Sequence, residues 1–282
     1  MTLSGHAIVA GVFGWPVSHS LSPHLHGYWL GEHGINGTYI PLPVPPDAFP
    51  QVVRLLPAMG MAGANVTLPH KEAALAAVDE ADGLAQRIGA VNTIVVRSDS
   101  SLFGRNSDAS GFISNLTAGA PDWRPEAGPA AILGAGGAAR AIAVALFDAG
   151  VPELRIVNRT VSRAEAVAAL VGDRSHVSLW IDRARALDGA ALVVNTTSLG
   201  MVGAAPLDLD LDHLPPDAVV TDTVYTPLAT PLLVAARARG NLCVDGLGML
   251  LHQGRMGFAA WYGAEPEVSQ GLRDFIVAKI KK

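Results

Sequence analysis

Short apolar runs alternate with longer amphipathic segments along the first third of the chain. The apolar runs predict strands over residues 7–14, 37–44, 63–68 and 90–96, and the segments between them predict helices over residues 21–34, 46–60 and 71–89. Ser22 and Pro23 are typical of a helix start, and a glycine closes each predicted helix. Alternation of this kind favours a mostly parallel sheet with helices on both faces.

This pattern is interrupted at residues 119–130, where glycine, proline and charged residues gather and predict a domain boundary. Beyond the boundary a strand, a glycine turn and a helix are expected over residues 129–150. Further β-branched runs, with helical segments between them, lie at residues 154–159, 191–198 and 218–224. Two helical stretches, 245–263 and 266–282, end the chain. We therefore expect an α/β protein of two domains.

Composition narrows the class of protein. With 282 residues, half of them hydrophobic and 16% charged, the chain is long enough for two packed domains. A net charge of −5 and the absence of any run of lysine or arginine argue against a nucleic-acid partner. The lone Cys243 excludes an intrachain disulfide and favours a reducing compartment. The N-terminus has no basic leader and no apolar stretch reaches about 18 residues, so a soluble, cytoplasmic protein without membrane contact is expected. The oligomeric state is left open between monomer and homodimer.

The string ILGAGGAAR at residues 132–140 fits the dinucleotide-binding pattern G-x-G-x-x-A. Its first glycine permits a tight turn, its second lets the backbone approach a pyrophosphate, and Ala139 lets the helix pack close to the strand. The turn follows an apolar strand and opens a helix that ends at Gly150, which is the context that this motif requires. A glycine-rich turn without a ligand is the alternative. The predicted cofactor contacts in the turn are Gly134, Ala135, Gly136, Gly137 and Ala138.

The end of the next predicted strand indicates which dinucleotide is bound. An NAD site usually has an Asp or Glu there, which bonds the ribose hydroxyls. This chain has Asn158, Arg159, Thr160 and Arg163 instead. A carboxylate would repel a ribose phosphate, whereas guanidinium groups pair with it. These residues therefore predict NADP, with ordinary surface arginines as the alternative.

Four further stretches place polar groups at the ends of predicted strands or in the turns that follow, namely SHSLSP (18–23), NVTLPHK (65–71), AVNT (90–93) and GRNSDASGF (104–112). Ligands of open α/β sheets bind outside the carboxyl ends of the strands. Hydroxyls, amides, one lysine and one aspartate converging there would suit a small polyhydroxylated acid. The alternative for each stretch is local turn and helix capping.

Taken together, these motifs resemble those of the shikimate dehydrogenases. The resemblance rests on GWPVSHSLSPHLH, GANVTLPHK, IGAVNT, GRNSDASGF, GAGGAAR, NRTVSR, VVNTTSLGM, DTVYTPLATPLL and DGLGMLLHQG, which cover nearly the whole chain in order. It implies reversible NADPH-linked reduction of 3-dehydroshikimate to shikimate, on the chorismate route to aromatic amino acids. It also implies a mostly parallel αβα substrate domain (residues 1–118 and 248–282), a Rossmann-type NADP domain (residues 119–247) and a cleft between them.

The resemblance also implies roles for individual residues. Ser20 and Ser22 would hold the substrate carboxylate, and Tyr225 would lie near the substrate. Gly246 and Met249 would lie near the nicotinamide. The ring hydroxyls would be bonded by Asn65, Thr67, Asn92 and Gln253.

Lys71 and Asp108 would form the catalytic pair. Carbonyl reduction needs a proton for the oxygen as well as a hydride for the carbon, and the protein must supply the proton. Desolvation lowers the pKa of a lysine, while a neighbouring carboxylate raises it and orients the ammonium group. We therefore expect Lys71 to donate and accept the proton and Asp108 to orient it. His70 is an alternative acid because its ordinary pKa is nearer neutrality.

Some choices stay open at this point. The motifs depart from the family pattern at Ser107 and Ala109, where Thr and Gly are common, and at Gly27, where Asn is common; Ala109 needs a backbone without positive φ. An NAD-linked quinate/shikimate dehydrogenase and a non-catalytic NADP-binding regulator are the alternative functions. The histidines show no metal-ligand spacing, so no metal is predicted.

Overall fold

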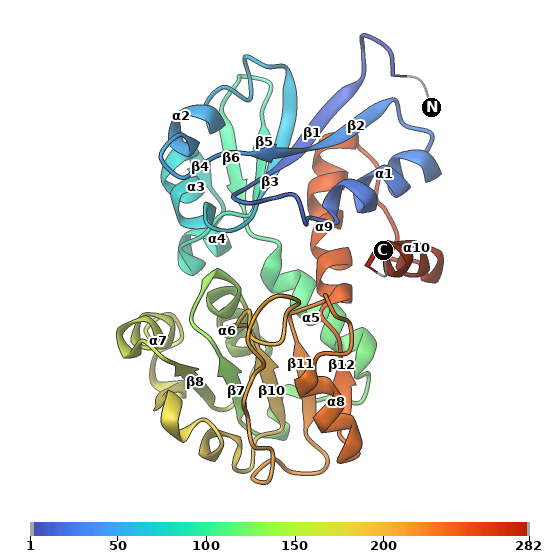
Figure 1. The fold of residues 1–282 in the computed structure, drawn as a ribbon. Helices are drawn as coiled ribbons and strands as arrows, with labels where there is room; N and C mark the ends of the chain where they lie inside the picture. Colours follow the sequence, from blue (N-terminus) through green and yellow to red (C-terminus); the bar gives the residue numbers. More distant parts are fainter. Residues whose placement is uncertain (1–2, 281–282) are drawn as a thin grey trace. The chain divides into compact units, whose positions relative to one another are not determined.

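The computed structural model describes residues 3–280 of the chain (Figure 1). The chain folds as two compact units. Unit 1 comprises residues up to Ser107 together with those from Leu250 onward, and unit 2 comprises Asp108–Met249. The predicted boundary at residue 118 lies inside helix α5 (Asp108–Gly119), and helix α9 (Leu247–Tyr262) crosses from unit 2 into unit 1. Lys281 and Lys282, which end the last predicted helix, lie outside the described residues.

Unit 1 is built on a six-stranded mixed sheet with the order β2-β1-β3-β5-β6-β4. Its strands are β1 (Ile8–Gly14), β2 (Gly37–Pro43), β3 (Met61–Val66), β4 (Glu80–Ala81), β5 (Thr93–Val96) and β6 (Leu102–Arg105). Its helices are α1 (Ser22–Glu32), α2 (Phe49–Val53), α3 (Lys71–Ala77), α4 (Gly83–Ile88), most of α9, and α10 (Gln270–Ile280). Helices α2, α3 and α4 cover one face, and α1, α9 and α10 cover the other (Figure 1).

Two predicted helices of unit 1 differ from the observed ones. The segment 71–89 is interrupted by β4, because Val78 has an extended backbone and Asp82 starts a new helix by accepting a hydrogen bond from the Ala85 N–H at 2.7 Å. The segment 46–60 is helical only over Phe49–Val53. Strand β6 has no counterpart among the predicted strands. It has four residues, which are too few for an alternation of apolar and polar positions to stand out from the polar residues that follow.

Unit 2 is built on a six-stranded sheet in which every pair of neighbouring strands is parallel. Its strands are β7 (Ala130–Leu133), β8 (Leu154–Asn158), β9 (Ser175–Leu179), β10 (Leu192–Asn195), β11 (Val219–Asp222) and β12 (Leu242–Val244). Its helices are α5, α6 (Gly137–Ala149), α7 (Val161–Ala168), α8 (Pro231–Ala238) and the short 3₁₀ turns η1 (Pro125–Ala127), η2 (Gly172–Arg174), η3 (Trp180–Asp182) and η4 (Arg185–Leu187).

The strand order of this sheet is β9-β8-β7-β10-β11-β12. Counted from β7, that is the 3-2-1-4-5-6 order of Rossmann folds, in which the chain reverses direction across the sheet between strands 1 and 4. The predicted Rossmann-type fold is confirmed, and the reversal lies between β7 and β10. Helix α8 and residues 186–218 bury an apolar cluster on one face of the sheet. The fully buried strand β7 explains why its sequence is a continuous apolar run.

Candidate active site

Polar residues gather at one edge of the unit 1 sheet, and the register of the strands explains why. Phe13 lies opposite Val66, Asn65 opposite Thr93, and Thr93 opposite Arg105. Strand β5 is antiparallel to both of its neighbours, so its beginning lies at the edge where β1, β3 and β6 end. Asn92, which immediately precedes β5, is thereby brought to the same edge as the polar residues that follow β3 and β6.

Asn92 is the centre of a buried hydrogen-bond network at this edge. Its Oδ1 accepts from the Ser107 N–H at 2.8 Å, the Ser107 hydroxyl at 3.2 Å and the Thr93 hydroxyl at 3.1 Å. These donors fix the orientation of the carboxamide, because an oxygen and not an NH₂ group must face them. Its Nδ2 points instead to Oε1 of Gln253 on α9, 3.4 Å away. Two of the residues predicted to bond the ring hydroxyls are therefore neighbours.

Asn65 is joined to this network from the neighbouring strand. Its Nδ2 donates to the Asn92 carbonyl and to the Thr93 hydroxyl, both at 3.1 Å. Its Oδ1 accepts from the hydroxyl of Tyr39 at 2.7 Å, and burial raises the pKa of that phenol, so it stays protonated. The Tyr39 ring stacks on His26 with centroids 3.9 Å apart. Both amide hydrogens of Asn65 are thus used within the protein, and its carboxamide is held in one orientation.

The remaining predicted substrate residues surround this edge. The Ser20 hydroxyl accepts a hydrogen bond from the Ser22 N–H at 3.3 Å. Ser20 therefore helps to form the turn that leads into α1, which is the alternative role considered for this stretch. At this helix start Pro23 has no N–H, and the Leu25 N–H donates to the Leu21 carbonyl at 3.0 Å, so hydroxyl groups are the main donors that the segment offers. Thr67 packs against Gly14, where a Cβ would lie 2.6 Å from the Thr67 methyl group. Only glycine at position 14 leaves room for Thr67.

Lys71 and Asp108 each begin a helix. Lys71 is the first residue of α3 in unit 1, and its carbonyl accepts the Val91 N–H at 2.9 Å. Asp108 is the first residue of α5 in unit 2, is 2% exposed, and directly follows Ser107. Lys71 is therefore tied by its backbone to the residue before Asn92, and Asp108 follows the residue whose N–H binds Asn92. Ala109 lies within α5 and its φ is not positive, so the departure from glycine there causes no strain.

His70 is held in a structural role. Its ring is 1% exposed and stacks on Phe49 with centroids 4.4 Å apart. Its Nε2 lies 2.8 Å from the Val44 carbonyl, an acceptor only, so this nitrogen carries the hydrogen. Burial lowers the pKa of His70, which keeps the ring neutral. These contacts leave His70 poorly suited to deliver a proton to a ligand.

The glycine turn of unit 2 has the shape that a dinucleotide requires. Gly134 has φ +112°, and a Cβ there would lie 2.4 Å from the Thr196 hydroxyl, so the residue must be glycine for the fold itself. Gly136 has an ordinary φ of −91° and nothing within 4 Å of its missing side chain. The fold alone does not need glycine at 136, whereas a pyrophosphate approaching the start of α6 does. Ala139 is fully buried.

The predicted phosphate-binding residues follow β8. Asn158 ends the strand, and its Nδ2 donates to the Thr160 carbonyl at 3.0 Å, which shapes the turn into α7. Arg159 and Thr160 are exposed in that turn, and Arg163 is exposed in the first turn of α7. No acidic residue stands at the end of β8 or in the turn that follows, so no carboxylate there would repel a ribose phosphate.

The last three predicted residues lie after β11 and at the start of α9. Tyr225 is part of the loop 223–229 that follows β11, and burial raises the pKa of its phenol. Gly246 lies against this loop, since a Cβ on it would be 2.4 Å from the Thr223 carbonyl oxygen. Met249 is 8% exposed in the first turn of α9.

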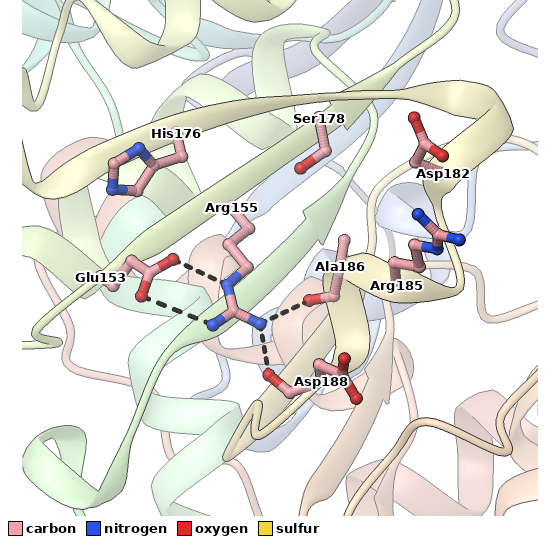
Figure 2. A pocket seen from close by; sticks show the side chains of 8 residues that line it. All are labelled: Glu153, Arg155, His176, Ser178, Asp182, Arg185, Ala186 and Asp188. Carbon is pink, nitrogen blue, oxygen red and sulfur yellow. Dashed lines mark hydrogen bonds and ion pairs between the residues drawn. The ribbon is translucent and has the colours of Figure 1, made fainter.

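A cavity of about 310 Å³ in unit 2 contains none of the predicted residues (Figure 2). Arg155 lies in it and donates to the Glu153 carboxylate at 2.7 Å and to the carbonyls of Ala186 and Asp188. The guanidinium group is thus used to fix the η4 segment beside β8, and we assign the cavity a structural role. Among residues 3–280 no group of three or more His, Cys, Asp and Glu side chains could hold a metal ion. The absence of a metal remains a prediction.

Sequence reasoning missed Tyr39 and Thr93, and it treated Ser107 only as a departure from the family pattern. All three bond the predicted ligands Asn65 and Asn92. Thr93 stands within the quoted AVNT motif, so its position was an available signal. Tyr39 lies in an ordinary strand pattern, and its bond to Asn65 depends on the strand order β2-β1-β3, which the sequence pattern does not give.

Two family models and a relative of high sequence identity match this chain. The family model described as the shikimate dehydrogenase substrate binding domain matches residues 12–94, and that described as shikimate/quinate 5-dehydrogenase matches residues 126–200. A shikimate dehydrogenase (NADP(+)) of Paramagnetospirillum magneticum is 59% identical over 98% of this chain and 100% of its own length.

Two solved structures are similar over nearly the whole chain. A shikimate 5-dehydrogenase from Thermus thermophilus, in complex with NADP(H) and shikimate, is 39% identical with a TM-score of 0.85 and covers 97% of this chain and 99% of its own. A quinate dehydrogenase from Corynebacterium glutamicum, in complex with NAD, is 29% identical with a TM-score of 0.89 and covers 96% of this chain and 99% of its own. The fold is therefore shared by enzymes that differ in substrate and cofactor.

Proposed function

This chain belongs to the shikimate dehydrogenase family, and we propose that it catalyses the reversible NADPH-dependent reduction of 3-dehydroshikimate to shikimate. The observation that carries the proposal is the Asn92 network. The Val91 N–H donates to the Lys71 carbonyl, and the N–H of Ser107, the residue before Asp108, donates to the side-chain Oδ1 of Asn92. These bonds support the proposal that the acid/base and substrate-binding residues act together at this edge of the sheet. The reaction is a step of chorismate and aromatic amino acid biosynthesis, and a cytoplasmic location remains a prediction.

The side chains at this edge suit a cyclic polyhydroxylated acid. We propose that the side chains of Ser20 and Ser22 hold the carboxylate. Asn65 and Asn92 present amide groups whose orientation is fixed by protein hydrogen bonds, so a ligand hydroxyl meets a preorganised partner. Thr67 and Gln253 complete the set of groups around the ring. Tyr225, from unit 2, is proposed to lie near the substrate.

Lys71 is the proposed acid/base. During reduction its ammonium group donates a proton to the carbonyl oxygen, and during oxidation the neutral amine accepts the proton from the hydroxyl. Asp108 is proposed to orient the ammonium group and to favour its charged form. Negative charge that develops on the carbonyl oxygen during reduction then meets a positioned proton donor. NADPH, when bound at the glycine turn, supplies the hydride. The structural role of His70 leaves Lys71 as the candidate that the contacts favour.

The cofactor preference follows from the turn after β8. We propose that Arg159 and Arg163 pair with the 2′-phosphate, and that Gly136 lets the pyrophosphate lie against the start of α6. Gly246 and Met249 are proposed to lie by the nicotinamide. The relative from Paramagnetospirillum magneticum is named as an NADP(+) enzyme, which agrees with this assignment.

The test is an absorbance assay at the nicotinamide band with each pairing of NADP or NAD and shikimate or quinate. We expect the highest kcat/KM with NADP and shikimate. A higher kcat/KM with NAD or with quinate would transfer the chain to the quinate/shikimate alternative, and no turnover with any pairing would favour a non-catalytic NADP-binding regulator.

Arginine variants test the assignment of the cofactor phosphate. Arg159→Ala is expected to lower the preference for NADP over NAD by about tenfold, because one charge-assisted hydrogen bond is lost. Arg185→Ala is the matched control, since Arg185 is an arginine of the same unit that lines the cavity of Figure 2. An unchanged preference in both variants would contradict the phosphate site.

A further inference from the structure

Asp222 is a buried carboxylate that the proposed chemistry does not use. It ends β11 and is 1% exposed. Its Oδ1 accepts hydrogen bonds from Asn195 Nδ2 at 2.9 Å and from the Val224 N–H at 3.0 Å, and its Oδ2 accepts from the Thr230 hydroxyl at 2.7 Å. All three partners are neutral. A carboxylate is seldom buried without a cation, so these contacts call for an explanation of their own.

The contacts of Asp222 with Val224 and Thr230 close the loop that follows β11. Thr230 is the N-cap of α8, and its hydroxyl joins the start of that helix to Asp222. The residues between them, 223–229, form the loop that carries Tyr225. The carbonyl of Thr226 in this loop also accepts the Val202 N–H at 2.9 Å. Asp222 therefore stands at the neck of the Tyr225 loop and holds its two ends together.

The third contact reaches a second loop. Asn195 ends β10 directly opposite Asp222 in the sheet register. Its Oδ1 accepts from the N–H and hydroxyl of Thr197, and its Nδ2 also donates to the Leu199 carbonyl at 3.2 Å. The same loop contains Thr196, whose hydroxyl donates to the Leu133 carbonyl beside the glycine turn. Asp222 and Asn195 thus link the Tyr225 loop to the strand that precedes Gly134.

We propose that Asp222 is a positioning residue that sets the place of the Tyr225 loop relative to the glycine turn, and so the place of Tyr225 relative to the substrate. The inference rests on the proposed function. Asp222 itself touches neither substrate nor cofactor in this proposal. The affinity for NADP should depend on it less than the KM for shikimate does. The turn at Gly134–Ala138 and the arginines after β8 do not bond Asp222, although Gly246, proposed to lie by the nicotinamide, packs against the loop.

The test compares Asp222→Ala and Asp222→Asn with wild type in steady-state kinetics and NADP titration. Asp222→Ala should raise the KM for shikimate by about tenfold to a hundredfold, because a displaced group near the substrate can cost that much. The Kd for NADP should stay within about threefold. Asp222→Asn should keep the KM within about threefold, because its Oδ1 still accepts and its Nδ2 can donate to the Thr230 hydroxyl.

Asn241→Ala is the matched control. Asn241 is 4% exposed at the opposite edge of the same sheet, and its Nδ2 donates to the carbonyls of Pro215, Pro216 and Ala218. Its replacement should lower the Tm without changing the KM. Should Asp222→Ala fail to fold, Thr230→Val is judged by the same criterion.

Each outcome has one reading. A raised KM in Asp222→Ala with normal values in Asp222→Asn and Asn241→Ala supports the positioning role. An unchanged KM in Asp222→Ala, or a Kd for NADP that rises as much as the KM, overturns it. An inactive wild type would instead overturn the proposed function, while active wild type with unaffected variants would overturn only the positioning role.

Discussion

The two sheets end in different kinds of binding surface. At the edge of the unit 1 sheet, side-chain amides and hydroxyls form one network around Asn92. At the edge of the unit 2 sheet, after β7, the proposed binding surface is formed by main-chain atoms of the glycine turn. Gly136 leaves space there because it has no side chain. Side chains can match the hydroxyl pattern of a small ring, whereas backbone N–H groups suit an anion whatever else is attached to it. The comparison predicts that unit 1 sets substrate specificity.

The largest effect is expected from removing the one cationic side chain proposed to act in unit 1. Lys71→Ala should lower kcat by about 100- to 10,000-fold, the usual worth of general acid–base catalysis. The KM for shikimate should change only a few-fold, because the amides and hydroxyls that bind the ring remain. Steady-state kinetics measure both values. Lys279→Ala, on α10, is the control, and a Lys71→Ala enzyme with nearly normal kcat would show that another group carries the proton.

The second prediction tests whether unit 2 binds through its backbone. Gly136→Val should raise the Kd for NADP by at least about tenfold and lower the Tm only slightly, because an added Cβ meets nothing within 4 Å and the main cost to the fold is a poorer N-cap of α6. Gly134→Ala should behave differently and lose stability, since its φ is +112° and Thr196 occupies the space. Fluorescence titration and thermal unfolding separate the two effects. Normal NADP binding by Gly136→Val would mean that the pyrophosphate lies elsewhere.

The glycine turn of unit 2 and the polar edge of unit 1 show what could and could not be predicted from the sequence. The pattern around Gly134 is local, so the strand, turn and helix follow from neighbouring residues and were predicted correctly. The unit 1 edge is not local in this sense. Asn92 reaches the site because β5 runs antiparallel, and nothing in the string AVNTIVV reports the direction of a strand. Tyr39 and Asp222 were likewise hidden, because the partners that give them meaning come from other strands.

The third prediction is that His26 in unit 1 and Asp222 in unit 2 contribute to the pH dependence of stability with opposite signs. In unit 1, burial lowers the pKa of His26 from 6.5 to about 3. The unfolded chain then takes up a proton as pH falls below 6.5 and the folded chain does not, so stability is lost on acidification. In unit 2, burial raises the pKa of Asp222 from 3.8 to about 6, against its three hydrogen bonds. The folded chain there keeps a proton between these values that the unfolded chain has released, so stability is gained on acidification.

Denaturant unfolding of variants separates the two contributions. Going from about pH 7.5 to pH 5, His26 should remove about 2 kcal/mol of stability and Asp222 should add about 1 kcal/mol. His26→Phe keeps the ring stack on Tyr39 but cannot titrate, so it should lose less stability than wild type over this range. Asp222→Asn should lose more than wild type. Shifts of the same sign in both variants would contradict the opposed assignment.

The smallest effect is expected from one hydroxyl behind the unit 1 network. Tyr39→Phe keeps the buried ring on His26 and removes the phenol hydroxyl, which donates to Asn65 Oδ1 and is also hydrogen-bonded with Ser22. Losing one such hydrogen bond costs about 1 kcal/mol, which corresponds to a rise of about fivefold in the KM for shikimate if Asn65 binds the ring.

Tyr262→Phe is the matched control for this variant, because the Tyr262 hydroxyl donates to the Thr38 carbonyl at 2.8 Å on the same strand β2. Both variants remove a phenol hydroxyl bonded within unit 1, and both should lower the free energy of unfolding by a similar amount. Only Tyr39→Phe should also change the KM, since only its acceptor is a proposed substrate ligand. Equal KM values in the two variants would mean that Asn65 is a structural residue, and that specificity for the ring rests on Asn92 and Gln253.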